Sequence, residues 1–420
     1  MNDQQTPKDD RHAVVIGAGI VGTCCALYLQ RAGLAVTLID RDGPGEAASF
    51  GNAGALGLAS VPPLGMPDTL WKAPKMILDP MHPLTLRWGH LPKALPWFLH
   101  FTLASLRSRA EAIADVRADL LGRVNDSYAP LLDDAGAKDL IHNAGLLMVF
   151  ESDRSRAEVE YALEMRRRRG VKIEELSGDE AREMEPALGP LIKRGVFFPQ
   201  VSQTVSPLRL TQTLAQHFQN RGGMLRRETV KGFDFGPDGP KGVVTDTGQH
   251  DADIMVLAAG VWSKFLARQL GTRVLLEAER GYHTVLPNPG VDIRVPLVSE
   301  DRHVTFGPME DGLRLTSMAE FAAIEAAPDY ARAERIFAAA RELIPGLDAE
   351  GATEWVGSRP STPDSIPVIG PSPRFANVLF AFGHGHLGLT LAAVTGRIVA
   401  DLAQGRRPET DLNPLRPDRF

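Results

Sequence analysis

Three glycines and an aspartate near the start of the chain have the types and spacing of a dinucleotide site. Gly17 permits a tight turn, Gly19 lets a pyrophosphate approach the backbone, and Gly22 lets a helix pack closely on a strand. Asp40 follows about 20 residues later, where a carboxylate can accept hydrogen bonds from ribose hydroxyls. The pattern does not separate FAD from NAD, and a glycine-rich structural turn is the alternative interpretation.

The residues around these glycines predict the βαβ unit that such a site needs. An apolar strand covers residues 12–16, a helix begins after the glycines, and a second strand ends at Asp40. A small-residue loop follows at 48–56, where bulky side chains would block a flat ring system; an ordinary flexible loop is the alternative. Residues 256–262 indicate a buried strand that runs into small residues and returns to the same sheet.

A second glycine pattern, GHGHLG at residues 383–388, lies between an apolar strand at 377–382 and a helix. It lacks the following strand and acidic residue of a dinucleotide unit. A glycine loop that opens a helix instead directs free N–H groups and a positive dipole at an anion. Reduced flavin carries such a charge, so we expect this loop to favour the reduced state of a flavin.

One arginine has the chemistry to bind a carboxylate. Arg359 lies in a segment rich in proline and glycine, residues 355–370, which predicts an irregular and rigid loop. No carboxylate is adjacent to it in sequence, and its guanidinium fork suits bidentate binding of a substrate carboxylate. A structural arginine that ties down loop carbonyls is the alternative.

Composition restricts the class of protein. The chain has 420 residues, 44% hydrophobic and 23% charged, which predicts a globular enzyme of two domains. The net charge of −6 argues against nucleic-acid binding. The only cysteines, Cys24 and Cys25, are adjacent, which argues against a disulfide framework or a spaced metal site. Together with a polar amino terminus that lacks a secretory signal, they predict a cytoplasmic protein.

Two further patterns have structural interpretations. The uncharged stretches at residues 13–30 and 375–396 contain glycines between a strand and a helix, so we interpret them as buried βα units rather than membrane spans. The basic run at 166–169 ends a helical pattern, where cations complement the helix dipole, and we interpret it as a solvated face.

Seven segments together resemble the FAD-dependent D-amino-acid oxidase superfamily and, within it, the bacterial D-amino-acid dehydrogenase small-subunit group. Relatives of that group include glycine and sarcosine oxidases and D-hydroxyproline dehydrogenases. The segments are VVIGAGIVG, SFGNAGAL, SPLRLTQTLA, VLAAGVW, RGYH, GSRPSTPDSIPVIG and GHGHLGLTLA. Their order and spacing exclude a nicotinamide-only dehydrogenase and a pyridine-nucleotide disulfide reductase.

The resemblance implies an α/β fold with a glutathione-reductase-like, FAD-binding Rossmann domain and a mixed α+β substrate domain. An antiparallel sheet of the substrate domain is expected to cover the flavin. The FAD-binding domain would comprise residues 10–90, 200–275 and 350–415, and the substrate domain residues 91–199 and 276–349. Some sarcosine oxidases attach flavin through a carboxy-terminal cysteine. Because no cysteine follows Cys25, we expect FAD to be bound noncovalently.

The resemblance also implies roles for individual residues. Arg359 is similar in position to the family's carboxylate-binding arginine, and Tyr282 would place its hydroxyl near the same carboxylate. Val230 resembles a residue that contacts adenine through its backbone, while His386 and Leu387 would lie at the pyrimidine end of the flavin. The predicted catalytic residues are Arg359 and Tyr282. The predicted cofactor-binding residues are Gly17, Gly19, Ile20, Gly22, Asp40, Arg41, Ser49, Asn52, Ala53, Gly54, Val230, Ala259, Gly260, Gly383, Gly385, His386, Leu387 and Gly388.

The expected reaction is oxidative deamination of a D-amino acid to the 2-oxo acid and ammonia. A hydride would pass from Cα to flavin N5, and the electrons would leave to a quinone or another respiratory acceptor. One alternative is an oxygen-using oxidase of glycine, sarcosine or a cyclic secondary amine. The other is a flavin-bearing subunit of a hetero-oligomeric amine dehydrogenase. No metal is expected.

Two features bear on the substrate and the acceptor. His283 either lines the pocket or is a satisfied surface histidine, and we prefer the surface interpretation. Residues 84–107 are apolar and aromatic but too interrupted to span a bilayer. We prefer a buried helix; the alternatives are a cover over the substrate pocket or a peripheral contact with the inner face of a membrane.

Overall fold

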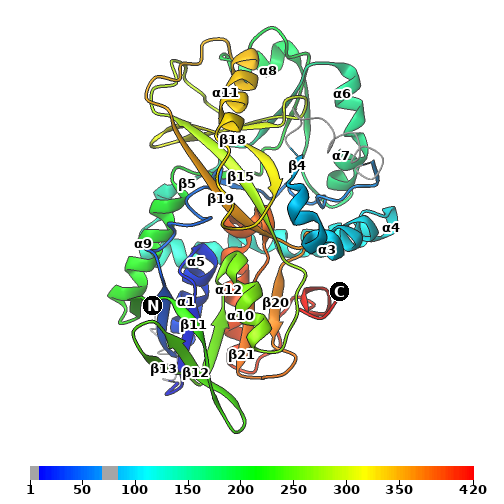
Figure 1. Cartoon of the computed structure of the whole chain (residues 1–420). Coiled ribbons are helices and arrows are strands. Elements are labelled where there is room, and N and C mark those ends of the chain that lie inside the picture. Colours follow the sequence, from blue (N-terminus) through cyan, green and yellow to red (C-terminus); the bar gives the residue numbers. More distant parts are fainter. Residues whose placement is uncertain (1–8, 69–83) are drawn as a thin grey trace.

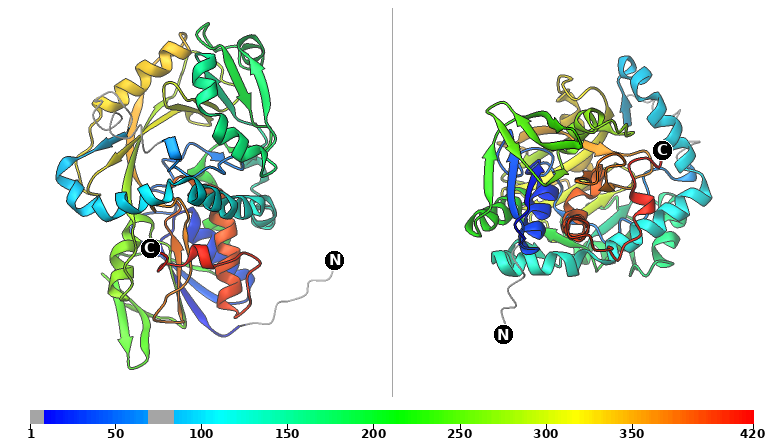
Figure 2. Two further views of the ribbon diagram at one scale, coloured as in Figure 1. Left: turned by 90° about the vertical axis from the view of Figure 1, so that its right-hand side faces the viewer. Right: turned by 90° about the horizontal axis from the view of Figure 1, so that it is seen from below.

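The computed structural model describes residues 9–68 and 84–420. It has two stacked domains, which we call the nucleotide domain and the cover domain (Figures 1 and 2). The nucleotide domain is built on a largely parallel sheet of six strands, and the cover domain on a large, mostly antiparallel sheet. The polar amino-terminal segment used to argue against export lies mostly outside the described residues.

The six-stranded sheet contains the predicted βαβ unit. Its strand order is β10-β2-β1-β14-β21-β20, and every neighbouring pair is parallel except β20 with β21. Strand β14, which runs into the small residues of VLAAGVW, pairs with β1 and so returns to this sheet as expected. The bounds are β1 His12–Ile16, β2 Ala35–Asp40, β10 Met224–Arg227, β14 Ile254–Leu257, β20 Val368–Pro371 and β21 Val378–Phe382.

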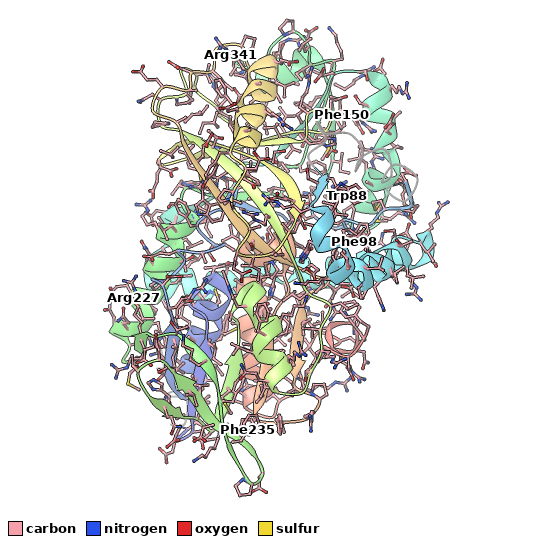
Figure 3. The ribbon with its side chains drawn as sticks, in the orientation of Figure 1. Trp88, Phe98, Phe150, Arg227, Phe235 and Arg341 are labelled. Carbon is pink, nitrogen blue, oxygen red and sulfur yellow. The ribbon has the colours of Figure 1, made fainter. Side chains whose placement is uncertain are left out.

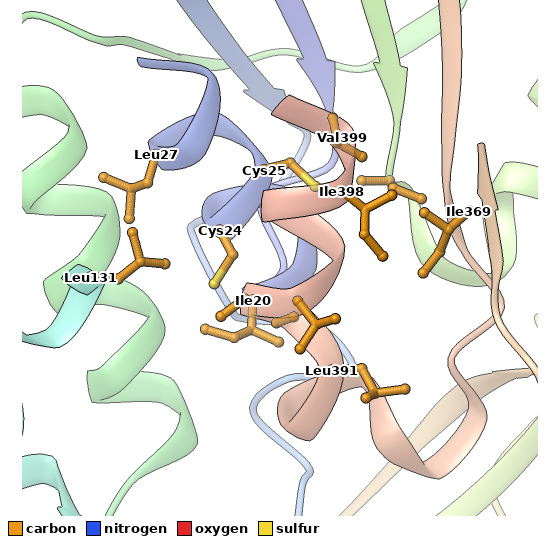
Figure 4. Close-up of a cluster of buried hydrophobic side chains, with 14 of the residues drawn as sticks. Ile20, Cys24, Cys25, Leu27, Leu131, Ile369, Leu391, Ile398 and Val399 are labelled. Atoms are coloured by element: carbon orange, nitrogen blue, oxygen red, sulfur yellow. The ribbon is translucent and has the colours of Figure 1, made fainter. Parts of the chain in front are cut away.

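Strand β1 is buried on both faces, because its alternate side chains enter two different cores. Ala13 and Val15 pack with α1, α5, α9 and α12, whereas Val14 and Ile16 pack with a three-stranded sheet and α10. Figure 4 shows Cys24 and Cys25 of α1 in the first core, close to α12. The helices are α1 Ile20–Arg31, α5 Val124–Ala135, α9 Pro207–Asn220, α10 Ser263–Gln269 and α12 Gly388–Ala403. The small sheet is β11 Val230–Gly236, β12 Gly239–Thr245 and β13 Gln249–Asp251.

The cover domain has a nine-stranded sheet with the order β19-β15-β18-β17-β16-β6-β8-β7, and β4 pairs additionally with β18. One face of its central strands packs against α11, Ala331–Leu343. The opposite face is turned toward the nucleotide domain (Figure 1). The bounds are β4 Leu84–Leu86, β6 Leu147–Phe150, β7 Glu174–Ser177, β8 Arg194–Phe197, β15 Glu277–Leu286, β16 Leu297–Ser299, β17 Val304–Met309, β18 Gly312–Phe321 and β19 Thr353–Ser361.

Shorter elements join the two domains. A small sheet contains β3 Ala55–Leu56, β5 Ile141–His142 and β9 Ser202–Thr204. Further α-helices among residues 9–68 and 84–420 are α3 Leu91–Ala104, α4 Arg107–Gly122, α6 Asp153–Glu158, α7 Glu160–Arg167 and α8 Gly178–Met184. Single 3-10 turns are η1 Trp88–His90, η2 Lys138–Leu140, η3 Gly260–Trp262, η4 Gly385–Leu387 and η5 Asn413–Leu415.

Two sequence-based expectations about this architecture are wrong in detail. The segment expected to be an irregular loop at 355–370 begins as a strand, β19, which pairs with β15 along its whole length. Pro360 is tolerated there because β19 is at the edge of the sheet, where a missing N–H breaks no second ladder. The domain boundaries shift accordingly, since β4 and β19 belong to the cover domain, and α5 packs in the core of the nucleotide domain.

Residues 84–107 form β4, η1 and the whole of helix α3, and end at the first residue of α4. Helix α3 lies at the junction of the domains (Figures 1 and 3). The prediction that this segment is a buried helix is confirmed for only one face of α3. Trp97 is buried, and it stacks on Phe101 with 5.2 Å between the ring centroids. The opposite face exposes leucines at every fourth position, namely Leu95, Leu99 and Leu103. The helix is therefore apolar on the side facing the protein and on the side facing away from it.

The basic run at 166–169 is only partly a solvated face. The Arg167 and Arg168 guanidiniums pair with acidic residues on the surface, as expected. Arg166 instead stacks over the Phe198 ring and donates from Nε to the Ala59 carbonyl. Burial lowers the pKa of Arg166 to about 10.

One helical stretch among the described residues, Gly385–Ala403, is long and apolar enough to cross a membrane. Of its most apolar window, 72% is buried inside the protein, where it packs on α1. It has the surroundings of a core helix, in agreement with the interpretation of residues 375–396.

Candidate functional site

A cavity of about 1290 Å³ lies between the two domains and is lined by residues of both. Small-molecule sites usually occupy roughly 300–1,000 Å³, so this one has room for a dinucleotide together with a small substrate. The predicted cofactor-binding residues all line it except Gly22, Gly54 and Gly383, which lie directly behind its wall. Residues that were predicted from separate segments of the sequence therefore lie around one continuous cavity.

The glycine turn after β1 forms one end of the cavity. Gly17 has φ of +107°, and a Cβ there would stand 2.5 Å from the Ala258 carbonyl oxygen. A Cβ on Gly22 would overlap the carbonyl oxygen of Gly17. Both glycines are thus required by close packing, as the sequence predicted. Gly19 is the N-cap of α1 and offers no side chain there, which leaves the start of the helix open to an anion.

The residues predicted to contact ribose and adenine also line the cavity. Asp40 ends β2 and accepts hydrogen bonds from the Ala18 and Asp42 amides at 2.6 and 2.9 Å. Burial raises its pKa, although these two amide donors oppose the shift. The Arg41 guanidinium stacks on the Trp262 ring at 3.9 Å, and Val230 lines the same part of the cavity. Trp262 was not among the predicted cofactor residues. The sequence feature that could have identified it is an aromatic residue two positions after the small residues of VLAAGVW.

The small-residue loop is held against the cover domain. The Arg314 guanidinium, on β18, donates to the Phe50 and Asn52 carbonyls at 2.6 and 2.9 Å. The Ser49 hydroxyl accepts from the Ile20 amide at 3.0 Å and so connects this loop to the start of α1. Any side chain on Gly51 would overlap the Trp355 ring. Sequence reasoning missed Arg314, since its partners are backbone carbonyls more than 260 residues away.

The second glycine pattern also lies at the cavity. Gly383 and Gly385 have φ of +80° and +52°, and the turn η4 leads directly into α12. His386 and Leu387 line the cavity at this helix start. The amino end of α12 therefore faces the cavity, with a glycine loop whose conformation other residues rarely adopt.

Arg359 lies on the cavity wall within an ion-pair cluster. Its Nη1 is 3.2 Å from Oε1 of Glu279, the residue directly opposite it on β15. The same Glu279 oxygen is 3.0 Å from Nε2 of His386. Burial alone would raise the pKa of Glu279, but His386 and Arg359 outweigh it and lower that pKa to about 2. Glu279 was not predicted from the sequence. The feature that could have identified it is an acidic residue two positions before the glycine of RGYH.

The structure does not bring the Tyr282 hydroxyl to Arg359, contrary to the expectation. In the continuous ladder between β15 and β19, Glu279 faces Arg359 and Tyr282 faces Val356, so their side chains lie on opposite faces of the sheet. Tyr282 is among the residues that line the cavity, but its ring packs in the core beside α11. Its hydroxyl donates to Glu320 at 2.9 Å and accepts from the Asp329 amide at 3.1 Å.

The preferred surface interpretation of His283 is also wrong. His283 is buried, and its ring stacks on Trp355 with 5.0 Å between centroids and 19° between planes. Phe50 meets both rings edge-on. Burial lowers the pKa of His283 to about 3, and the Arg314 charge adds to the effect. A neutral imidazole thus helps to support the loop at 49–54.

Comparison with known proteins agrees with this geometry. Residues 12–402 match the family model described as FAD dependent oxidoreductase. A D-amino-acid oxidase of Bradyrhizobium diazoefficiens is 37% identical, over 98% of this chain and 99% of the relative. A D-amino acid dehydrogenase of Paramagnetospirillum magneticum is 35% identical, over 97% and 98%.

Solved structures share the fold. L-proline dehydrogenase from P. horikoshii has a TM-score of 0.75 at 19% identity, over 98% of each chain. Glycine oxidase from Geobacillus kaustophilus has a TM-score of 0.73 at 21% identity, over 98% of this chain and 99% of the other. The glycine cradle, the open start of α1 and the acidic end of β2 fit the dinucleotide that this fold binds. The chain therefore belongs to the FAD dependent oxidoreductase family and takes FAD as its cofactor.

Proposed function

We propose that this protein oxidises a D-amino acid to the 2-oxo acid and ammonia. The observation that carries the proposal is the position of Arg359, a carboxylate-binding side chain on the cavity wall beside the start of α12. Two relatives of similar length, named D-amino-acid oxidase and D-amino acid dehydrogenase, support the choice of substrate. Bound FAD would accept the hydride, which carries both electrons of the oxidation.

The residues that would hold FAD follow from the cavity. The start of α1 would bind the pyrophosphate, Asp40 the ribose, and Val230 with Trp262 the adenine end. The loop at 49–54 and the start of α12 would hold the ring system. Both cysteines are buried in α1 and do not line the cavity, which supports noncovalent attachment.

Arg359 would bind the substrate carboxylate through two parallel hydrogen bonds, and so fix the orientation of the Cα–H bond. Aromatic side chains of α3 and β18 would exclude water from the same space, because Trp97, Phe98 and Phe321 all line the cavity. Positioning by these residues, rather than a side-chain base, would supply most of the protein's contribution to the rate.

An anaerobic titration tests this proposal. We expect D-amino acids to bleach the flavin absorbance of the purified holoenzyme, with L-enantiomers, glycine, sarcosine and D-hydroxyproline as comparison ligands. We further propose a quinone as acceptor, so the reduced protein should be reoxidised faster by a quinone analogue than by air. Bleaching by L-enantiomers or N-methyl amines alone would contradict the choice of substrate, and faster reoxidation by air would contradict the choice of acceptor.

We propose in addition that α3 contacts the inner surface of a membrane, where a quinone would be reached. Its outward face carries Leu95, Leu99 and Leu103, and Trp88 just before it is 63% exposed. No acidic residue occurs between positions 84 and 110, whereas Arg87, Lys93, Arg107 and Arg109 do. Apolar side chains flanked by cations suit the interface of an anionic bilayer, where each cation contributes about 1 kcal/mol.

Sedimentation with vesicles tests this contact. We expect the holoenzyme to bind vesicles of phosphatidylglycerol and phosphatidylcholine, and the double substitution Leu95→Asp, Leu99→Asp to weaken binding at least tenfold, since it places two anions in the interface. Leu191→Asp is the matched control, because Leu191 is 40% exposed but follows α8, away from α3. Equal binding by the double variant and the control would rule out α3 as the contact.

A further inference from the structure

A buried carboxylate lies beside the arginine expected to bind substrate. Glu279 is 2% exposed and lines the cavity. One of its oxygens, Oε1, contacts Arg359 and His386, two side chains from different elements that line the same cavity. Its other oxygen, Oε2, is buried and has no hydrogen bond among the described residues, although the Ser361 hydroxyl is near enough to affect the carboxylate. The cluster thus places a buried carboxylate on the cavity wall, beside the arginine.

The local backbone fixes the arginine against this carboxylate. Glu279 and Arg359 face each other across the β15–β19 ladder, and Gly281 is the next residue on the same face. A side chain on Gly281 would overlap the Arg359 guanidinium, so the glycine provides the space in which the guanidinium lies. The separation of the two charges is therefore set by two paired strands rather than by flexible loops.

This pair of charges matches one class of ligand. A site for simple carboxylates would gain nothing from an acid beside its arginine, because the acid neutralises the guanidinium and repels the incoming anion. An α-amino acid carries a carboxylate and an ammonium group on the same carbon. Arg359 and Glu279 present the complementary charges side by side, and an ammonium group in the cavity could donate to the Glu279 carboxylate, which lines it.

We propose that Glu279 binds the substrate ammonium group while Arg359 binds the carboxylate. This inference rests on the proposed function and makes Glu279 a determinant of specificity for the zwitterion. The same carboxylate would weaken binding of the 2-oxo acid, which has no amine, and so favour release of the product. Without substrate, Glu279 and Arg359 satisfy each other's charge, as the structure shows.

Glu277 provides a matched control two residues earlier on the same strand. It is 5% exposed and pairs with Lys264 Nζ at 2.6 Å and His90 Nε2 at 2.9 Å. Like Glu279, it is a buried carboxylate on β15 that contacts one basic side chain and one histidine. Unlike Glu279, it does not line the cavity.

The test compares two ligands in the holoenzyme of Glu279→Gln and Glu277→Gln. The concentration dependence of anaerobic flavin reduction gives the apparent affinity for D-alanine, and perturbation of the flavin spectrum gives the affinity for propionate. For Glu279→Gln we expect D-alanine to bind about 10- to 100-fold more weakly, the effect of losing one hydrogen bond to a charged group. Propionate should bind as tightly as in the wild type or more tightly. Glu277→Gln should change neither affinity.

Opposite changes in the affinities for D-alanine and propionate would show that Glu279 binds the ammonium group and does not merely orient Arg359. Parallel weakening of both ligands would mean that Glu279 only orients Arg359, and the proposal would be wrong. Unchanged affinity for D-alanine would also overturn it. If Glu279→Gln loses FAD, the wild type still gives an answer: D-lactate, with a hydroxyl in place of the amine, must bind at least tenfold more weakly than D-alanine. A wild type that no amino acid reduces would refute the proposed function instead.

Discussion

Replacing Arg359 by methionine should lower kcat/KM for a D-amino acid about a thousandfold while leaving FAD in place. Arg359 lies on the wall of the cavity, and its guanidinium would make two hydrogen bonds to the substrate carboxylate. Each hydrogen bond to a charged group contributes about 1.5–3 kcal/mol, so losing both corresponds to roughly two to four orders of magnitude. Methionine keeps much of the side-chain length but provides no donor. Steady-state rates with a quinone analogue, together with flavin absorbance per protein, measure the two quantities separately.

The conservative substitution Arg359→Lys separates charge from geometry. A lysine retains the positive charge beside Glu279 but has no planar fork, so it cannot bind both carboxylate oxygens in parallel. We expect it to recover part of the loss, with a kcat/KM between those of the wild type and Arg359→Met. Values for both variants within tenfold of the wild type would show that another residue binds the carboxylate.

The turn around Gly17 and Gly22 could be predicted from sequence because its requirements are local. Both glycines are needed where the chain approaches itself within a few residues or meets the neighbouring strand, and the spacing of the glycines in the sequence expresses that need. The strands β1, β2, β14 and β21 were predictable for a related reason. They are continuous apolar runs, as expected of parallel strands buried on both faces.

The contacts of the cover domain could not be derived in the same way. Glu279 and Arg359 are 80 positions apart, and their contact depends on the register between β15 and β19. Proline and glycine in the second strand favoured a loop, although an edge strand accepts both. A shift of one residue in the register would exchange the faces of Tyr282 and its neighbours, which is why its role could not be assigned from spacing alone.

The same reasoning applies to His283. All ten residues of β15 are buried, including two glutamates, an arginine and a histidine. A polar strand of this kind normally has one solvated face, which would have left His283 at the surface. The loop at 49–54 and the Trp355 ring cover that face instead. The cover is a long-range contact that no pattern within the strand reveals.

Acid should destabilise this protein already between pH 6.5 and 5, through two buried histidines. Burial lowers the pKa of both His283 and His384 to about 3, whereas an unfolded chain has a histidine pKa near 6.5. Between these values the unfolded state binds more protons, so stability falls as the pH falls. At pH 5 each histidine should cost about 2 kcal/mol, a large part of a total stability of roughly 5–15 kcal/mol.

The substitution His283→Phe tests this origin of the acid sensitivity. Phenylalanine can keep the stacking on Trp355 but cannot take up a proton, so it should remove about half of the extra destabilisation at pH 5. The measurement is the urea midpoint of the holoenzyme at pH 7.5 and pH 5.0 with saturating FAD. Carboxylates that titrate in the same range affect both proteins equally and cancel in the comparison. His142→Gln, which removes an exposed imidazole, should leave the difference between the two midpoints unchanged. If His283→Phe loses as much stability as the wild type on acidification, the buried imidazole is not the cause.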